Sequence, residues 1–149
     1  MCGIFGVISN DINKNKFNSS LNLLSHRGPD NTNTSFFEKF AFGHTRLSIQ
    51  DLTQTGNQPM FDEQKNCIIY NGEIYNFKIL RKKLEQTKNV FNTQTDTEVI
   101  LKSVSNYGLE ESLKLFRGML FETSDFKQVE KMLIKKLTDS IEKLNQGGL

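Results

Sequence analysis

The second residue of the chain is a cysteine that stands directly before an apolar segment. The chain begins MCGIFGVISN, and residues 4–8 carry a β-branched side chain at three of five positions. This pattern predicts a short buried strand, so we expect Cys2 at the end of a strand and at the edge of a sheet. Cys2 then has two interpretations: a small apolar residue that starts the strand, or a reactive group.

A cysteine in this position can become a reactive nucleophile once Met1 is removed, as is usual before a small residue. Cys2 then carries a thiol and a free α-amine. Because α-amines titrate at about 7.7 to 8.0, part of them is unprotonated near neutral pH and can accept the thiol proton. The thiolate can attack a carbonyl, and the amine can pass the proton to the leaving group. One residue can therefore supply both nucleophile and general base.

The remaining sequence alternates strand-like and helix-like segments. Alternation in FAFGHTRLSIQDL predicts a strand that directs Leu47 and Ile49 toward the core and Arg46 to the opposite face. A second strand is expected over 67–70, before an Asn-Gly turn. Apolar residues at helical spacing predict helices containing residues 17–24, 77–84 and 95–107, a short helix through 113–116, and a long amphipathic tail helix from 125 onwards.

The helix starts have their own signals. Asn76 is expected to cap the helix that follows it, and Thr95 with Glu98 has the spacing of a capping box.

Acyl transfer also requires an oxyanion hole and groups that hold the substrate. The amide of Asn71 and the N–H of Gly72 can supply the hole, Arg46 can bind a carboxylate, and Asp96 or Glu73 can bind an ammonium group. A substrate with all three features is an amino acid with a side-chain amide, for which glutamine is the metabolic candidate. Each residue also has a simpler structural explanation, namely a turn, a solvated strand residue or a first-turn helix acid.

Composition excludes several other classes of function. With 24% charged residues, a formal net charge of +2 and acidic residues mixed into the basic stretches, the chain predicts no nucleic-acid partner. No apolar run approaches the ~20 residues that span a bilayer, and no secretion signal precedes the first strand, so we expect no membrane partner and a cytoplasmic location. Cys2, Cys67, His26 and His44 show no metal-ligand spacing, which predicts no metal site. We expect the histidines to be structural and Cys67 to be a buried strand residue.

Five motifs together resemble a known family. MCGIFGV, HRGPD, GHTRLSI, NGEIYN and TDTEVIL follow one another over residues 1 to about 119. In this order they resemble the glutaminase domain of class II glutamine amidotransferases, in the branch of glutamine-hydrolysing asparagine synthetases. The resemblance implies an α+β fold, the N-terminal-nucleophile hydrolase αββα sandwich, in which two antiparallel sheets lie between helices.

The resemblance also implies roles for individual residues. Cys2 would form a thioester with L-glutamine and release ammonia, while Asn71 and Gly72 would stabilise the oxyanion. HRGPD would help to wall the site. Arg46 and Asp96 would bind the carboxylate and amine of glutamine, and the residues that would complete the pocket are Leu47, Ile49 and Glu73.

The sequence departs from the family after RGM at 117–119, where further strands of the sandwich are expected but a helical pattern follows. We therefore predict a partial amidotransferase domain over 1–120, an incomplete sandwich, and over 121–149 a helical tail that resembles the segment before the synthetase ATP loop. No cofactor is expected in this chain, because ATP and Mg²⁺ would belong to the synthetase domain.

Three hypotheses remain open. The chain is a glutaminase, an inactive and internally deleted remnant, or an interaction module. In the last case the tail helix would bind a synthetase subunit or a second copy of the chain.

Overall fold

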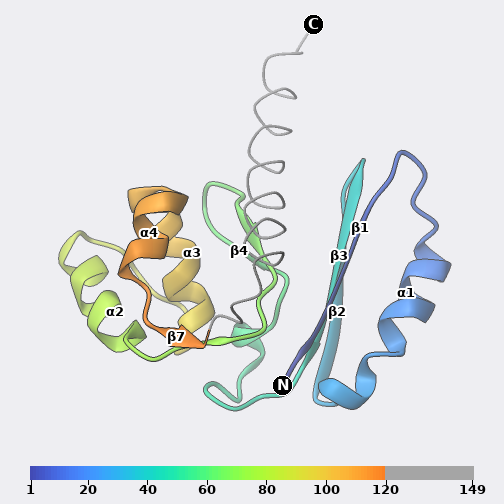
Figure 1. Cartoon of the computed structure of the whole chain (residues 1–149), viewed down its shortest axis with the longest axis horizontal. Coiled ribbons are helices and arrows are strands. Elements are labelled where there is room, and N and C mark those ends of the chain that lie inside the picture. Colours follow the sequence, from blue (N-terminus) through green and yellow to red (C-terminus); the bar gives the residue numbers. More distant parts are fainter. Residues whose placement is uncertain (120–149) are drawn as a thin grey trace, which may run out of the picture. The chain divides into compact units, whose positions relative to one another are not determined.

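The computed structural model describes residues 1–119, with side chains through Gly118, and shows a mixed α/β fold. The chain divides into two units, 1–118 and 119–149. The predicted tail helix and the predicted domain over 121–149 lie outside the described residues. The four α-helices of the described part are α1 (Lys14–Asn22), α2 (Phe77–Gln86), α3 (Asp96–Tyr107) and α4 (Leu109–Leu115) (Figure 1). None of the helices in this part is long and apolar enough to cross a membrane.

A three-stranded antiparallel sheet positions the start of the chain. Its strands are β1 (Gly3–Ile8), β2 (Asn31–Phe36) and β3 (Phe40–Arg46), in the order β1-β3-β2. The predicted strand over 4–8 is confirmed. No predicted element corresponds to β2, because NTNTSF lacks the apolar alternation that marks a half-buried strand. The register pairs Gly3 with Thr45 and Asn31 with Arg46, so the residue after Cys2 lies beside the end of β3.

Helix α1 covers one face of this sheet (Figure 1). Phe17 and Leu21 are buried and form the core with Ala41 of β3. A Cβ on Gly43 would lie 2.6 Å from Leu21 Cδ2, so a glycine is needed where the helix crosses the strand. The predicted apolar face of this helix is therefore confirmed at Phe17 and Leu21, whereas Leu24 lies beyond the end of α1 at Asn22.

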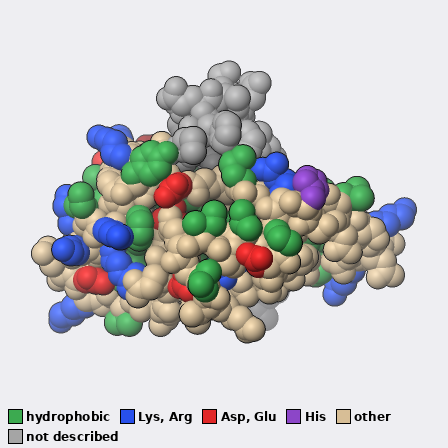
Figure 2. Space-filling view, turned by 90° about the horizontal axis from the view of Figure 1, so that it is seen from below, with side chains coloured by type: hydrophobic (Ala, Val, Ile, Leu, Met, Phe, Trp, Pro, Cys, Tyr) green, Lys and Arg blue, Asp and Glu red, His purple; other side chains and the backbone are tan. Residues whose placement is uncertain are grey.

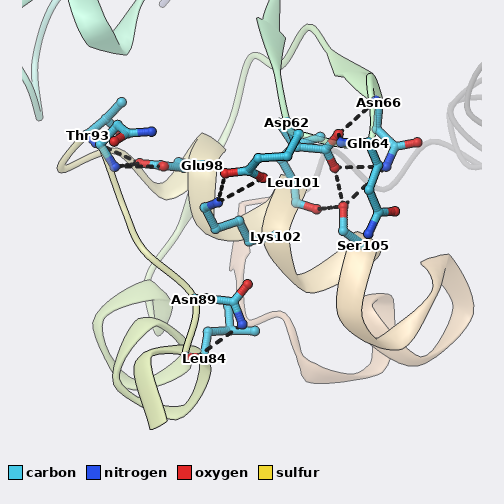
Figure 3. A network of polar contacts seen from close by, with 12 residues as sticks. Asp62, Gln64, Asn66, Leu84, Asn89, Thr93, Glu98, Leu101, Lys102 and Ser105 are labelled. Atoms are coloured by element: carbon cyan, nitrogen blue, oxygen red, sulfur yellow. Dashed lines mark hydrogen bonds and ion pairs between the residues drawn. The ribbon is translucent and has the colours of Figure 1, made fainter. Parts of the chain in front are cut away.

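Helix α3 contacts α2, α4 and a short hairpin. The hairpin consists of β4 (Met60–Phe61) and β5 (Cys67–Ile68), so β5 is shorter than the strand expected over 67–70. A polar network joins the hairpin turn to α3 (Figure 3): Ser105 Oγ donates to Asp62, and Lys102 Nζ lies 3.1 Å from Glu63 Oε1. A second small sheet pairs β6 (Glu73–Ile74) with β7 (Gly118–Met119).

The expected helix caps are only partly observed. Thr95 Oγ1 accepts from Glu98 N (3.3 Å), but the Glu98 carboxylate accepts from Asn92 N and Thr93 N, so half of the capping box forms. Asn76 is the N-cap residue of α2 as predicted, but its side chain makes no capping hydrogen bond. Its Oδ1 accepts from Arg117 N and its Nδ2 donates to Leu115 O, both at 2.9 Å, because the segment before β7 runs alongside it.

Candidate active site

Cys2 lies half-buried at the point where β1 begins and β3 ends. Its Sγ accepts a hydrogen bond from Leu47 N at 3.3 Å, and its carbonyl oxygen accepts from Arg27 Nε at 3.1 Å. Gly3 N donates to Thr45 Oγ1 at 3.1 Å. These contacts hold the thiol at the end of β3, one residue beyond Arg46.

The HRGPD motif packs against the same end of β3. A Cβ on Gly28 would lie 2.2 Å from the carbonyl oxygen of Thr45, so only glycine permits this approach of the two backbones. Asp30 Oδ2 accepts from Ser48 N at 2.6 Å, which holds the segment after β3. The motif therefore lies next to Cys2.

The Arg46 side chain is buried, whereas a strand residue of this type is usually solvated. Nη1 donates to Thr53 O (2.7 Å) and Asn57 Oδ1 (2.8 Å), and Nη2 donates to Asp51 O. A Cβ on Gly56 would lie 2.5 Å from Nη2, so the 51–57 segment surrounds the guanidinium group. Nε donates to no other residue in the described part of the chain.

Asp96 is the first residue of α3, and its carboxylate is buried. Oδ2 accepts from Ile74 N at 2.9 Å. Burial raises the pKa of Asp96, and the nearby Glu73 carboxylate adds to this increase. Among residues 1–118 no lysine or arginine forms an ion pair with Asp96. A buried carboxylate without a cationic partner is well suited to bind an ammonium group.

Gln50 joins the two acidic residues. Its Oε1 accepts from Asp96 N at 3.3 Å, and its Nε2 donates to Glu73 Oε1 at 3.4 Å. Asn71 is half-buried, and its amide has no hydrogen-bond partner among the described residues. A Cβ on Gly72 would lie 2.6 Å from the Tyr70 hydroxyl. The two hydrogen bonds of Gln50 thus join the segment that follows Arg46 to the segments that contain Glu73 and Asp96.

The expectation that Ile49 lies in the core is wrong, because β3 ends at Arg46 and the residues beyond it leave the sheet. Ile49 is 75% exposed, while Leu47 is half-buried beside the thiol. Exposed hydrophobic side chains also appear across the middle of the face in Figure 2, together with acidic side chains. Ile49 therefore has a surface position in the described part of the chain.

Asp51 is a site residue that the sequence reasoning missed. It is buried, its Oδ1 accepts from Thr53 N at 2.8 Å, and its Oδ2 accepts from Gln94 N at 2.9 Å. These hydrogen bonds, led by that from Gln94, lower the pKa of Asp51. The available signal was an aspartate two residues before a threonine in a turn-rich segment, which is typical of an Asx turn.

His44 lies on the Arg46 face of β3 and is 1% exposed. Burial lowers its pKa from 6.5 to about 4. The unfolded chain therefore binds the proton more strongly, so stability is lost as the pH falls from about 6.5 and the loss is complete below about 4. Between about pH 7 and pH 5 we expect the free energy of unfolding to fall by about 2 kcal/mol from this residue.

Urea unfolding of variants at the two pH values tests this expectation. The His44→Gln variant should lose this part of the pH dependence, whereas His26→Gln should retain it, because His26 is exposed. An unchanged slope in His44→Gln would show that other groups cause the acid sensitivity.

The candidate site thus comprises a half-buried cysteine directly before β1, a buried arginine, and a buried carboxylate that forms no ion pair with a described residue. Residues 1–135 match the family described as a glutamine amidotransferase domain, and the chain belongs to this family. The five sequence motifs and the family match therefore indicate the same family.

Curated relatives carry more specific names. Asparagine synthetase [glutamine-hydrolyzing] 1 of Bacillus subtilis is 39% identical over 126 residues, which are 80% of this chain and 20% of the relative. Asparagine synthetase [glutamine-hydrolyzing] 2 of Arabidopsis thaliana is 39% identical over 134 residues, with 84% and 22% covered. Putative asparagine synthetase [glutamine-hydrolyzing] 2 of Methanocaldococcus jannaschii is 36% identical over 140 residues, with 80% and 26% covered. The chain therefore spans about a quarter or less of the length of these relatives.

Proposed function

We propose that this chain hydrolyses L-glutamine to glutamate and ammonia through a thioester on Cys2. The observation that carries the proposal is the hydrogen bond from Leu47 N to Cys2 Sγ (3.3 Å), because it places the thiol one residue from Arg46. Gln50 of the same segment contacts Glu73 and the backbone of Asp96. The names of the curated relatives, which include glutamine hydrolysis, support the same reaction.

The reaction begins when Met1, which is 59% exposed, has been removed. The Cys2 thiol gives its proton to the new α-amine, and Sγ attacks the side-chain carbonyl carbon of glutamine. Asn71 and Gly72 donate hydrogen bonds to the oxyanion. The C–N bond then breaks, the amine returns the proton, and ammonia leaves. Water attacks the thioester, the C–S bond breaks, and glutamate and the thiol are released.

Substrate binding uses opposite charges at the two ends of the site. Arg46 would bind the α-carboxylate, and its buried position strengthens this interaction because few water molecules compete. Asp96 would bind the α-ammonium group, which supplies the cation that the buried carboxylate lacks among the described residues. Leu47, Ile49 and Glu73 would complete the pocket.

The same proposal includes the complete fold, the cellular location and the acceptor of the ammonia. The small sheets would belong to an N-terminal-nucleophile αββα sandwich, and the protein would act in the cytoplasm. Ammonia would pass to a synthetase domain or subunit, which alone would bind ATP and Mg²⁺.

Mass spectrometry of the intact protein with an electrophilic ketone analogue of glutamine tests this function. We expect loss of Met1, one adduct that maps to Cys2, and equimolar glutamate and ammonia when glutamine replaces the analogue. A protein that unfolds cooperatively but forms neither adduct nor ammonia would exclude catalysis. A protein without cooperative unfolding would instead favour the inactive remnant.

A further inference from the structure

Asp51 joins two segments that are far apart in the sequence. Its Oδ1 accepts from Thr53 N (2.8 Å) and Thr53 Oγ1 (2.6 Å), and its Oδ2 accepts from Gln94 N (2.9 Å). Both carboxylate oxygens are therefore used within the protein, and the side chain is buried. The proposed reaction gives this carboxylate no role.

The two joined segments carry the groups that would bind opposite ends of the substrate. The carbonyl oxygens of Asp51 and Thr53 accept from Arg46, and Gln94 lies two residues before Asp96. Gln50 makes a parallel connection, because its Oε1 accepts from Asp96 N at 3.3 Å. Residues 50 and 51 thus connect the surroundings of Arg46 to the start of α3.

We infer that Asp51, assisted by Gln50, is a positioning residue that fixes the separation of Arg46 and Asp96 and so sets the affinity of the site for an α-amino acid. This inference rests on the proposed function. A carboxylate is required because an asparagine has one acceptor oxygen and an NH₂ group that only donates. An amide at position 51 cannot accept from Thr53 N and Gln94 N with two different atoms.

A purely electrostatic role for Asp51 predicts the opposite result. The negative charge of Asp51 attracts the Arg46 guanidinium, so its removal would strengthen the attraction of Arg46 for a substrate carboxylate and lower KM. Loss of positioning would raise KM. The direction of the change in KM therefore distinguishes the two roles.

The test compares D51N with D62N in the full chain. Asp62 is a matched carboxylate in the β4–β5 turn (Figure 3), where it accepts from Gln64 N, Asn66 N and Ser105 Oγ. We expect D51N to raise KM for glutamine about tenfold with kcat within about twofold, and D62N to change neither, although both variants lower Tm. An unchanged or lowered KM in D51N, or an equal rise in D62N, would overturn the inference.

Two further measurements keep the inference testable. Q50A replaces an exposed side chain and is expected to fold if D51N does not; it should raise KM about threefold, and an unchanged KM would count against the inference. Hydrogen exchange of the Gln94 amide should be faster in D51N than in the wild type and unchanged in D62N.

The failure of the inference can be separated from the failure of the proposed function. Exchange of the Gln94 amide that is equally slow in D51N and wild type would overturn the inference alone. A wild-type chain that binds glutamine without hydrolysing it would reject the proposed function, and the same tenfold change would then be sought in Kd by calorimetry.

Discussion

Replacement of Cys2 by alanine is expected to lower kcat for glutamine hydrolysis by at least about 10⁴-fold, because the variant lacks the atom that forms the thioester. Alanine also removes the acceptor of the hydrogen bond from Leu47 N, but Gly3 and Thr45 still hold the start of β1. The loss should therefore occur in a folded protein. Coupled detection of glutamate and ammonia measures the rate, and circular dichroism checks the fold.

Cys67 offers a matched control, because it is the other cysteine of the chain and is half-buried in β5. Burial raises the pKa of its thiol to about 12, so it remains protonated at neutral pH and is a poor nucleophile. The Cys67→Ala variant should keep kcat within about twofold of the wild type. Full hydrolysis by Cys2→Ala, or equal loss in both variants, would reject Cys2 as the nucleophile.

Replacement of Asp96 by asparagine is expected to lower kcat/KM for glutamine about 100-fold, because a buried charge-assisted bond to the substrate ammonium is lost. An asparagine oxygen can still accept from Ile74 N, so the backbone contact is preserved. Steady-state kinetics over a range of glutamine concentrations measure the effect. Methylammonium or other amines should not restore the rate, since the missing group is a carboxylate.

The same variant should be as stable as the wild type or more stable at neutral pH. Because burial raises the pKa of Asp96 in the folded protein, ionisation of this carboxyl lowers stability as the pH rises above the ordinary range of an aspartate. Asparagine removes the charge. Urea unfolding of Asp96→Asn should therefore show no loss in the free energy of unfolding.

Glu98 on the same helix turn should behave in the opposite way. Its carboxylate accepts from Asn92 N and Thr93 N, so Glu98→Gln should reduce stability by about 1 to 3 kcal/mol and leave kcat/KM within about threefold. If Asp96→Asn destabilises the protein without a change in kcat/KM, then Asp96 has a structural role and the proposed binding mode is wrong.

Much of the fold could be predicted because it depends on local patterns. The apolar residues of α1 identify a helix without knowledge of its neighbours, although α1 ends at Asn22, before the Gly-Pro sequence at 28–29. The same holds for α3, with Thr95 at its N-terminus and Gly108 at φ 77° at its C-terminus. In contrast, β2 has a polar sequence, and only its pairing with β3 makes it a strand.

Part of the candidate site could likewise be predicted from the sequence, and part could not. Cys2, Arg46 and Asp96 were identified as candidates from their chemistry and from motifs. In the structure, Leu47 N donates a hydrogen bond to the Cys2 thiol, and Asp96 is buried. The surroundings of Arg46 could not be predicted, because its partners include backbone carbonyl oxygens of the 51–57 segment. Every residue has a backbone carbonyl group, so the sequence does not indicate which carbonyl oxygens accept hydrogen bonds from Arg46.

The sequence by itself determined the family and the helices that local periodicity specifies. Only the tertiary structure decided that Ile49 is exposed, that Asn76 contacts the segment before β7, and that Asp51 reaches Gln94. The physical reason is that these outcomes depend on where a strand ends and on which distant backbone N–H groups come within hydrogen-bond distance. Such contacts form between segments about 40 residues apart, as with Asp51 and Gln94, and no local pattern encodes them.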